Sequence, residues 1–313
     1  MADYTRLTST AAIKLLSNYN LGKLKRMDPL DGGQANSSFK FTTENGAFVL
    51  SVCDEKNRKE IDCLTRVLAY LETKAFPTTR PVRTRTGGYF ITHGRKPGYV
   101  KEFIPGKVIR RLTPDMVCQV GTAVADLHDL PVLKEMPRHF PYGIEAFSEF
   151  LKGDLEHPYV AWLGQKREFL EQALDPAMEK GFIHGDIFWD NLLFSHDRLV
   201  AILDFEEACC YYKLYDLGMC AVGCCSRNGS FDLQRVTSLI TGYQQRRPLS
   251  KREKPQLKVF MEYAAVAASF WRFCQYNIKY PLPEKADTYK ELSSLADQIH
   301  DLEKTRFMEC FTA

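Results

Sequence analysis

Two carboxylates and one amide with the chemistry of a metal-assisted site lie in one stretch of the sequence. Asp186 lies five residues before Asn191 and two after His184, which gives the spacing H-x-D-x-x-x-x-N. Asp204 follows Asn191 by thirteen residues, directly after the apolar segment 199–203. Asp and Asn supply the oxygen atoms that a hard cation such as Mg²⁺ prefers. The spacing therefore predicts a metal site beside a further carboxylate.

Phosphoryl transfer accounts for this set of residues. The transferred group and its leaving nucleotide carry several negative charges, which a divalent metal neutralises, and Asn191 and Asp204 are its predicted ligands. The acceptor hydroxyl must be oriented and must lose its proton, and Asp186 is the predicted base. We expect His184 to organise the loop through hydrogen bonds. The alternative is a polar loop between two strands that carries no chemistry.

The same stretch resembles the catalytic core of the aminoglycoside phosphotransferase and choline kinase superfamily. Within it, the chain is most similar to the bacterial homoserine kinases of the protein-kinase-like type, over nearly its whole length. Outside the core the resemblance rests on short segments: Tyr4-Thr-Arg-Leu-Thr, Leu21-Gly22, the loop before Ser37-Ser38, Ala208-Cys209, Tyr215-Asp216-Leu217, Gly242-Tyr243 and Arg247-Pro-Leu-Ser. It implies an α+β, protein-kinase-like fold of two lobes, the N-terminal one β-rich and the C-terminal one mainly helical.

The resemblance also implies roles for particular residues. Asp186 matches the catalytic aspartate, and Asn191 and Asp204 match the metal ligands. Asp216 would brace the catalytic loop from the following helix, with a plain helix-capping aspartate as the alternative. ATP would be the phosphoryl donor together with Mg²⁺, and the sequence does not choose between ATP and GTP.

Local signals along the chain agree with two lobes. Segment 35–53 alternates and contains Asn45-Gly46, a strong hairpin signal. Residues 83–103 indicate two more strands, and the break at 103–106 separates a nucleotide-binding lobe (1–103) from a catalytic and acceptor-binding lobe (104–313). Helices are predicted from apolar periodicity over 8–18, 56–74, 113–129, 214–225, 231–246, 252–278 and 285–308.

A segment containing glycines and serines precedes the first arm of the predicted hairpin. Gly32 and Gly33 would let backbone N–H groups approach phosphates, and Ser37 and Ser38 would add donors. By itself the segment is more typical of an ordinary β-turn, and it is not a Walker P-loop, because G-x-x-x-x-G-K-[ST] is absent. In front of this catalytic core it is interpreted as a phosphate-binding loop.

The end of the N-terminal lobe is predicted to bind the nucleobase through the backbone of Lys101 and Phe103. The alternative is an edge strand with incidental charges. One position departs from the kinase pattern, in which a lysine on the strand after the loop hairpin holds the α- and β-phosphates. Ser51 stands there, and Lys40, Lys56 or Arg58 are open replacements.

Acceptor-binding residues are predicted among the C-terminal helices. Segment 252–278 carries aromatic residues at helical spacing, which is typical of a core; the alternative is a pocket wall that binds a quaternary amine. Arg272 is a candidate for binding a carboxylate, and Glu206 for binding an ammonium group. Gly185 and the pair Glu206-Glu207 depart from the homoserine-type pattern.

Composition limits the class of protein. The net charge of +3, from 42 basic and 39 acidic residues, does not indicate a nucleic-acid-binding protein. No apolar run approaches the roughly 20 residues of a membrane span, and the N-terminus does not resemble a secretory signal, so we expect a cytoplasmic protein without a membrane partner. The ten cysteines have no metal-site spacing and are expected to be free thiols.

Together these features predict a small-molecule kinase, an ATP-dependent phosphotransferase with an alcohol group as acceptor. Its expected partners are a nucleotide and a small hydroxyl-bearing substrate, and the sequence does not indicate an oligomeric state. Homoserine is the favoured acceptor; choline, a methylthio-sugar and an aminoglycoside are alternatives. Because Ser51 replaces the lysine, a nucleotide-binding pseudokinase that acts as an interaction module is the non-enzymatic alternative.

Overall fold

The computed structural model describes residues 7–30, 36–227 and 229–312. The chain divides into two compact units. The N-terminal unit comprises the residues up to Lys107 together with Val200–Phe205, and the C-terminal unit comprises Val108–Leu199 together with Glu206–Ala313. The N-terminal unit thus ends at Lys107, four residues after the predicted boundary at 103. No local signal in the sequence predicted that 200–205 belongs to this unit.

A five-stranded antiparallel sheet forms the centre of the N-terminal unit, in the order β1-β2-β3-β5-β4. Its strands are β1 (Leu24–Leu30), β2 (Asn36–Thr43), β3 (Gly46–Cys53), β4 (Phe90–His93) and β5 (Lys96–Glu102). The turn between β2 and β3 contains Asn45-Gly46, and the positive φ of Gly46, +134°, is the conformation that glycine adopts without strain. β1 was not predicted; it is an edge strand, which tolerates its Pro29.

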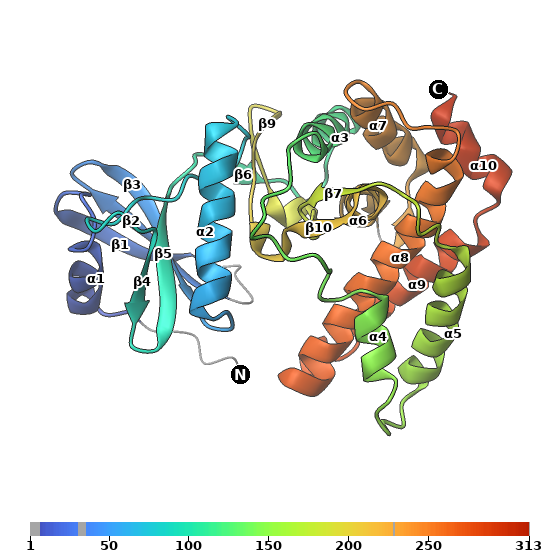
Figure 1. The fold of residues 1–313 in the computed structure, drawn as a ribbon, viewed down its shortest axis with the longest axis horizontal. Helices are drawn as coiled ribbons and strands as arrows, with labels where there is room; N and C mark the ends of the chain where they lie inside the picture. Colours follow the sequence, from blue (N-terminus) through green and yellow to red (C-terminus); the bar gives the residue numbers. More distant parts are fainter. Residues whose placement is uncertain (1–6, 31–35, 228, 313) are drawn as a thin grey trace. The chain divides into compact units, whose positions relative to one another are not determined.

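The sheet lies between two helices, α1 (Ser9–Leu16) and α2 (Arg58–Thr73), both predicted from the sequence (Figure 1). The side chain of Thr8 caps α1, and Asn57 forms a capping box with Glu60 at the start of α2. The core on the α1 side takes side chains from alternate positions of three strands: Phe39, Phe41, Leu50, Val52 and Val100. The intervening residues of β2, β3 and β5 therefore point to the other face of the sheet.

Residues 200–205 pack against the segment that follows α2. The backbone N–H of Ile202 donates to the carbonyl of Pro77 at 2.8 Å, and the rings of Phe205 and Phe76 meet edge to face with centroids 5.9 Å apart. The same segment also borders β5, because Val82 donates its N–H to Val100 and Glu102 donates to Arg80. Asp204 is thereby held in the unit that contains the sheet.

The C-terminal unit is mainly helical. Its central helices are α3 (Pro114–His128), α6 (Lys213–Cys225), α7 (Leu233–Gln244) and α8 (Glu253–Phe273), and the pairs α3–α7 and α6–α8 pack together. Peripheral helices are α4 (Ile144–Phe150), α5 (Pro158–Ala173), α9 (Tyr289–Asp301) and α10 (Lys304–Met308). A two-stranded ladder pairs β7 (Lys180–Ile183) with β10 (Cys209–Tyr212). The α+β prediction, with strands first and helices after, is confirmed.

Two predicted helices end earlier than expected. The helix predicted over 252–278 changes to a π-helix at Cys274–Lys279, and the helix predicted over 285–308 is interrupted at Leu302, whose ψ of 119° is extended. The aromatic side chains of α8 lie mostly in the core, so they form part of the hydrophobic interior, as predicted from their helical spacing. Buried members are Phe260, Tyr263, Phe270 and Phe273.

The ten cysteines are free thiols, and six of them are buried. They include Cys220, Cys224 and Cys225 of α6, where burial raises the pKa of each thiol and so keeps it protonated. Within the described ranges, no helix combines the length and the apolar character that a membrane span requires.

Candidate active site

The loop that carries Asp186 begins directly after a buried strand. β7 ends at Ile183, His184 and Ile187 are fully buried, and a 3₁₀ turn at Trp189–Asn191 ends the loop. The backbone N–H of Asp186 donates to Nδ1 of His184 at 3.1 Å. His184 therefore organises the loop from inside through a hydrogen bond, as the sequence analysis expected.

Asp216 anchors the loop from α6. Its carboxylate accepts the backbone N–H of His184 at Oδ2, at 2.9 Å, and that of Gly185 at Oδ1, at 2.7 Å. Asp216 is completely buried in the first turn of α6. The geometry is that of the brace implied by the resemblance and not that of a helix cap.

A third donor reaches Asp216 from α3. Nε2 of His128 lies 3.2 Å from Oδ2 of Asp216, and Nδ1 of His128 lies 2.8 Å from the hydroxyl of Tyr243. A carboxylate only accepts hydrogen bonds, so Nε2 carries the proton, and the Tyr243 hydroxyl then donates to Nδ1. Tyr243 in turn accepts from Nη1 of Arg247 at 3.4 Å, so the donors form one directed line from Arg247 to Asp216.

The charge states of the buried pair follow from its surroundings. Burial lowers the pKa of His128 and outweighs the attraction of Asp216, so the imidazole stays neutral. Burial alone would raise the pKa of Asp216, but the hydrogen bond from His128, together with His184, lowers it below its usual range. The anchor is thus a carboxylate that faces a neutral imidazole.

Asn191 is oriented by Asp186. Its Nδ2 donates to the backbone oxygen of Asp186 at 2.9 Å and to Oδ2 of Asp186 at 3.2 Å. With the nitrogen side of the amide committed to Asp186, the side-chain oxygen is directed away from it. This orientation fits the role of a metal ligand, because Mg²⁺ binds the amide oxygen and not the nitrogen.

Asp204 follows β9 (Arg198–Ile202) and is exposed, while Phe205 beside it is buried. Its φ of +64° is uncommon for a residue with a side chain, and such conformations cluster at functional sites. An exposed carboxylate in this conformation provides the hard oxygen donor that a divalent cation needs. Among the described residues, no group of three His, Cys, Asp or Glu side chains could hold a metal ion. The metal roles of Asn191 and Asp204 stay predictions.

Gly185 is required by the shape of the loop. Its φ is +88°, and a Cβ there would lie 3.0 Å from the carbonyl oxygen of Glu207 and 3.1 Å from the ring of Phe140. This crowding gives a physical reason for the glycine at a position where the homoserine-type pattern tends to have alanine.

The two serines predicted to bind phosphates point to opposite faces of the sheet. Ser37 donates to Oδ2 of Asp54 at 2.8 Å, on the face that α1 covers, whereas the hydroxyl of Ser38 lies 3.3 Å from that of Ser51 on the other face. Gly32 and Gly33 lie outside the described residues. A phosphate role for these four positions stays a prediction.

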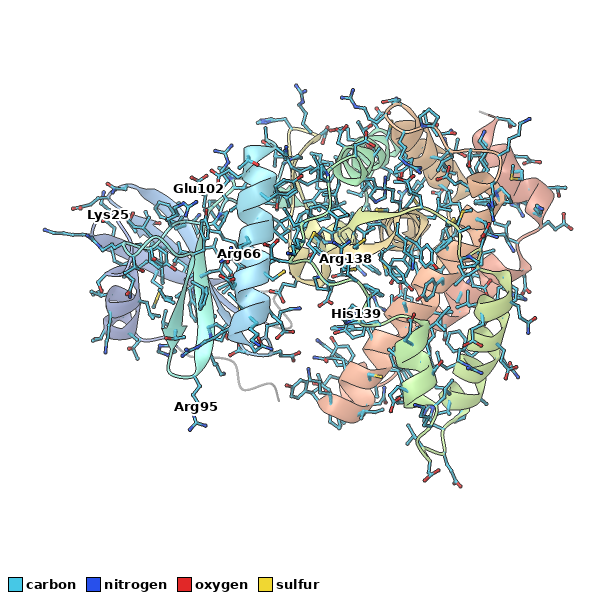
Figure 2. The ribbon with its side chains drawn as sticks, viewed as in Figure 1. Lys25, Arg66, Arg95, Glu102, Arg138 and His139 are labelled. Atoms are coloured by element: carbon cyan, nitrogen blue, oxygen red, sulfur yellow. The ribbon has the colours of Figure 1, made fainter. Side chains whose placement is uncertain are left out.

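The predicted nucleobase-binding segment is the end of β5. Figure 2 shows Arg95 at the turn before β5 and Glu102 at its other end, which marks the direction of the strand. The backbone N–H of Phe103 donates to the carbonyl of Ala47 at 3.1 Å, so a nucleobase contact at Phe103 would use its carbonyl. The nucleobase roles of Lys101 and Phe103 stay predictions.

The two acceptor-binding candidates are both partly exposed in the C-terminal unit. Nη1 of Arg272 donates to the carbonyl of Thr288 at 3.0 Å and lies 2.9 Å from Oε2 of Glu291, so this arm of the guanidinium joins α8 to α9. Glu206 lies in the 3₁₀ turn Phe205–Glu207 after Asp204. Their acceptor roles stay predictions.

Sequence reasoning missed His128. It follows the apolar positions Val117 and Val124 of α3 at helical spacing and is the one strongly polar side chain on that stripe, which was the available signal. Its partner Asp216 lies 88 residues further along the chain, so nothing local connected the two.

Comparison with known proteins identifies the family of this chain. The model of a family described as "Phosphotransferase enzyme family" matches residues 26–249. The homoserine kinase of Phenylobacterium zucineum (strain HLK1) is 30% identical over 274 residues, 85% of this chain and 85% of that protein. The homoserine kinase of Caulobacter sp. (strain K31) is 29% identical over 275 residues, 85% of this chain and 86% of that protein.

Among solved structures, amicoumacin kinase in complex with AMP-PNP, Ca²⁺ and Ami is similar with a TM-score of 0.76. It is 13% identical and covers 96% of this chain and 97% of its own. At this identity the likeness is one of fold, and it confirms the predicted two-lobe, protein-kinase-like type.

Proposed function

Since the chain belongs to the phosphotransferase enzyme family and is a small-molecule kinase, we propose that it transfers the γ-phosphoryl group of ATP to the hydroxyl of homoserine. The observation that carries the choice of acceptor is the likeness to homoserine kinases at 29–30% identity over 85% of the chain. A match of that extent includes the loop around Asp186 wherever in the chain the match begins.

Asp186 is the proposed catalytic base. It lies at the start of a loop whose backbone is fixed by Asp216, and its Oδ2 is oriented by the amide of Asn191. A carboxylate held in this way can orient the acceptor hydroxyl and take its proton as the oxygen attacks the γ-phosphorus. Positioning, which is the main contribution of protein groups to phosphoryl transfer, is what these hydrogen bonds provide.

Mg²⁺ is the proposed metal, with the side-chain oxygen of Asn191 and the carboxylate of Asp204 as ligands. The oxygen chemistry of both residues and the orientation of the Asn191 amide support this choice. When bound, the ion would neutralise charge on the phosphate oxygens. We also propose that Ser38, on the face of the sheet that α1 does not cover, is the serine that faces the nucleotide.

The test separates the base from a structural aspartate. In Asp186→Asn the side chain keeps its shape but loses its basicity, so kcat should fall about 10²–10⁴-fold. The Kd for ATP, measured by calorimetry, and Tm should stay close to the wild-type values. Asp190→Asn is the matched control, because it makes the same chemical change at an exposed position of the same loop; it should keep kcat within about 3-fold.

Acceptor choice is tested with the wild-type protein. The values of kcat/KM for homoserine, choline and kanamycin are compared at equal ATP, and homoserine should be preferred by at least ten-fold. A preference for choline or kanamycin would overturn the acceptor and leave the kinase chemistry in place. A fall in kcat of less than about ten-fold in Asp186→Asn would remove Asp186 as the base.

A further inference from the structure

The sheet of the N-terminal unit lacks a cation where the kinase pattern places one. Ser51 occupies that position on β3 and is 1% exposed. The phosphates of a nucleotide carry several negative charges, so the proposed function, on which this inference rests, requires a positive side chain on the same face of the sheet. The strand register identifies which side chains share that face.

Four pairs of cross-strand neighbours define the face. Ser51 pairs with Ser38 of β2 on one side and with Tyr99 of β5 on the other. Two residues nearer the end of β5, Val49 pairs with Lys40 on one side and with Lys101 on the other. Side chains two residues apart on a strand share a face, so Lys40 and Lys101 both point to the face that carries Ser51.

The ammonium groups of these two lysines lie in opposite directions along the sheet. Nζ of Lys40 lies 3.6 Å from the centroid of the Phe103 ring, beyond the end of β5 and away from Ser51. Nζ of Lys101 lies 5.4 Å from the centroid of the Tyr99 ring, and Tyr99 is the residue opposite Ser51. Two residues along a strand span about 7 Å, so a distance of 5.4 Å indicates that the side chains of Lys101 and Tyr99 lean toward each other.

Another nearby cation, Lys96, is excluded by its position. Its Nζ lies 2.6 Å from Oδ1 of Asp54, which is 7% exposed, and Asp54 accepts from Ser37 on the face that α1 covers. Lys101, in contrast, is connected to the segment that holds Asp204 through residues 77–81. Pro81 forms a β-bridge with Lys101, and Pro77 of the same segment accepts from Ile202.

We propose that Lys101 of β5 supplies the positive charge for the α- and β-phosphates of the nucleotide that β3, with Ser51, does not supply. The serine side chain is shorter than a lysine at the position opposite Tyr99, and the ammonium group of Lys101 on the neighbouring strand lies beside the Tyr99 ring. The positive charge would thus come from β5 and not from the neighbouring strand β3 of the same sheet. Both strands belong to the unit that contains Asp204.

The test measures nucleotide binding as well as turnover. Lys101→Met keeps the length of the side chain and removes its charge, so the Kd for ATP should rise about 10- to 100-fold, the usual effect of losing a charge-assisted hydrogen bond, while the Kd for adenosine stays unchanged. Lys40→Met is the matched control and should bind ATP within about 3-fold of the wild type. Adding Ser51→Lys to Lys101→Met returns a lysine to β3 and should restore most of the ATP affinity and kcat.

Calorimetry separates failure of this assignment from failure of the proposed function. Wild-type affinity for ATP in Lys101→Met, or a loss of affinity confined to Lys40→Met, would overturn the role of Lys101 even if homoserine is phosphorylated. An equal loss of ATP and adenosine binding in Lys101→Met would show a general disturbance of the sheet and would also overturn it. If homoserine is not phosphorylated, the binding measurements still decide the role of Lys101.

Discussion

Replacing Asp216 by asparagine should destabilise the protein and misplace the catalytic loop. Oδ2 of Asp216 faces two donors, Nε2 of His128 and the N–H of His184, and Oδ1 faces the N–H of Gly185. An asparagine places an NH₂ group at one of these two positions. In the better orientation the NH₂ faces Gly185, so one buried N–H loses its acceptor and the new NH₂ group has no acceptor either.

The magnitude follows from this count. Each buried polar group without a partner costs about 1–3 kcal/mol, so the two together cost about 2–6 kcal/mol. For a chain of 313 residues the unfolding entropy is about 0.66 kcal/mol/K, and the expected fall in Tm is therefore about 3–9 °C. A displaced loop should also lower kcat by about 10²-fold, while the Kd for ATP changes little.

Acid titration gives an independent signature of the same substitution. The pKa of Asp216 is lowered in the folded state, so its carboxylate stabilises the protein above the unfolded pKa of about 3.9, and this contribution is lost as the pH falls through the folded value. The difference in unfolding free energy between the wild type and Asp216→Asn should be constant near neutral pH and should narrow below about pH 4.

Thermal unfolding by calorimetry, urea titrations from pH 3 to 8 and steady-state kinetics measure these quantities. Asp129→Asn is the control, since Asp129 is an exposed residue at the end of α3, next to His128. A Tm within 1 °C of the wild type together with an unchanged kcat would refute the assignment of Asp216 as the anchor of the loop.

Two further predictions concern the helices behind the anchor. A Cβ at Gly242 would overlap the backbone of Cys118, so Gly242→Ala should push α3 and α7 apart and lower the unfolding free energy by about 1–3 kcal/mol in urea titrations, whereas Gly164→Ala, in open space within α5, should be neutral or stabilising. Tyr243→Phe leaves Nδ1 of His128 without its donor and should lower the unfolding free energy by about 1–3 kcal/mol in the same measurement. Tyr70→Phe is the control and should cost much less, because the Tyr70 hydroxyl has no hydrogen-bond partner among the described residues. Equal effects of the two substitutions would argue against the line of donors from Arg247 to Asp216.

The parts of the fold that the sequence predicted are those with local causes. Asn45-Gly46 specifies a tight hairpin turn through its backbone preferences, and Thr113 caps α3 through a hydrogen bond to Met116, three residues further on. β1 was missed because its stability comes from pairing with β2 and not from alternation in its own sequence, where Lys25, Arg26 and Pro29 interrupt the apolar pattern.

The candidate site shows the same division. The spacing of Asp186, Asn191 and Asp204 was visible because each follows an element that can be recognised in the sequence. His128 was not, because it meets Asp216 only after α3, α6 and α7 have packed. Lys101 was predicted for its backbone, and the face to which its side chain points depends on the register of β5 against β3.

The loop is attached to Asp216 through main-chain atoms, the N–H groups of His184 and Gly185. An attachment of this kind constrains the path of the backbone, which requires glycine at 185, but its hydrogen bonds do not involve the side chains of the loop. Loops on rigid supports are where proteins vary their specificity. Under the proposed function, evolutionary change of acceptor would proceed through side chains around Asp186 and on the C-terminal helices, while the aspartate that holds the loop stays the same.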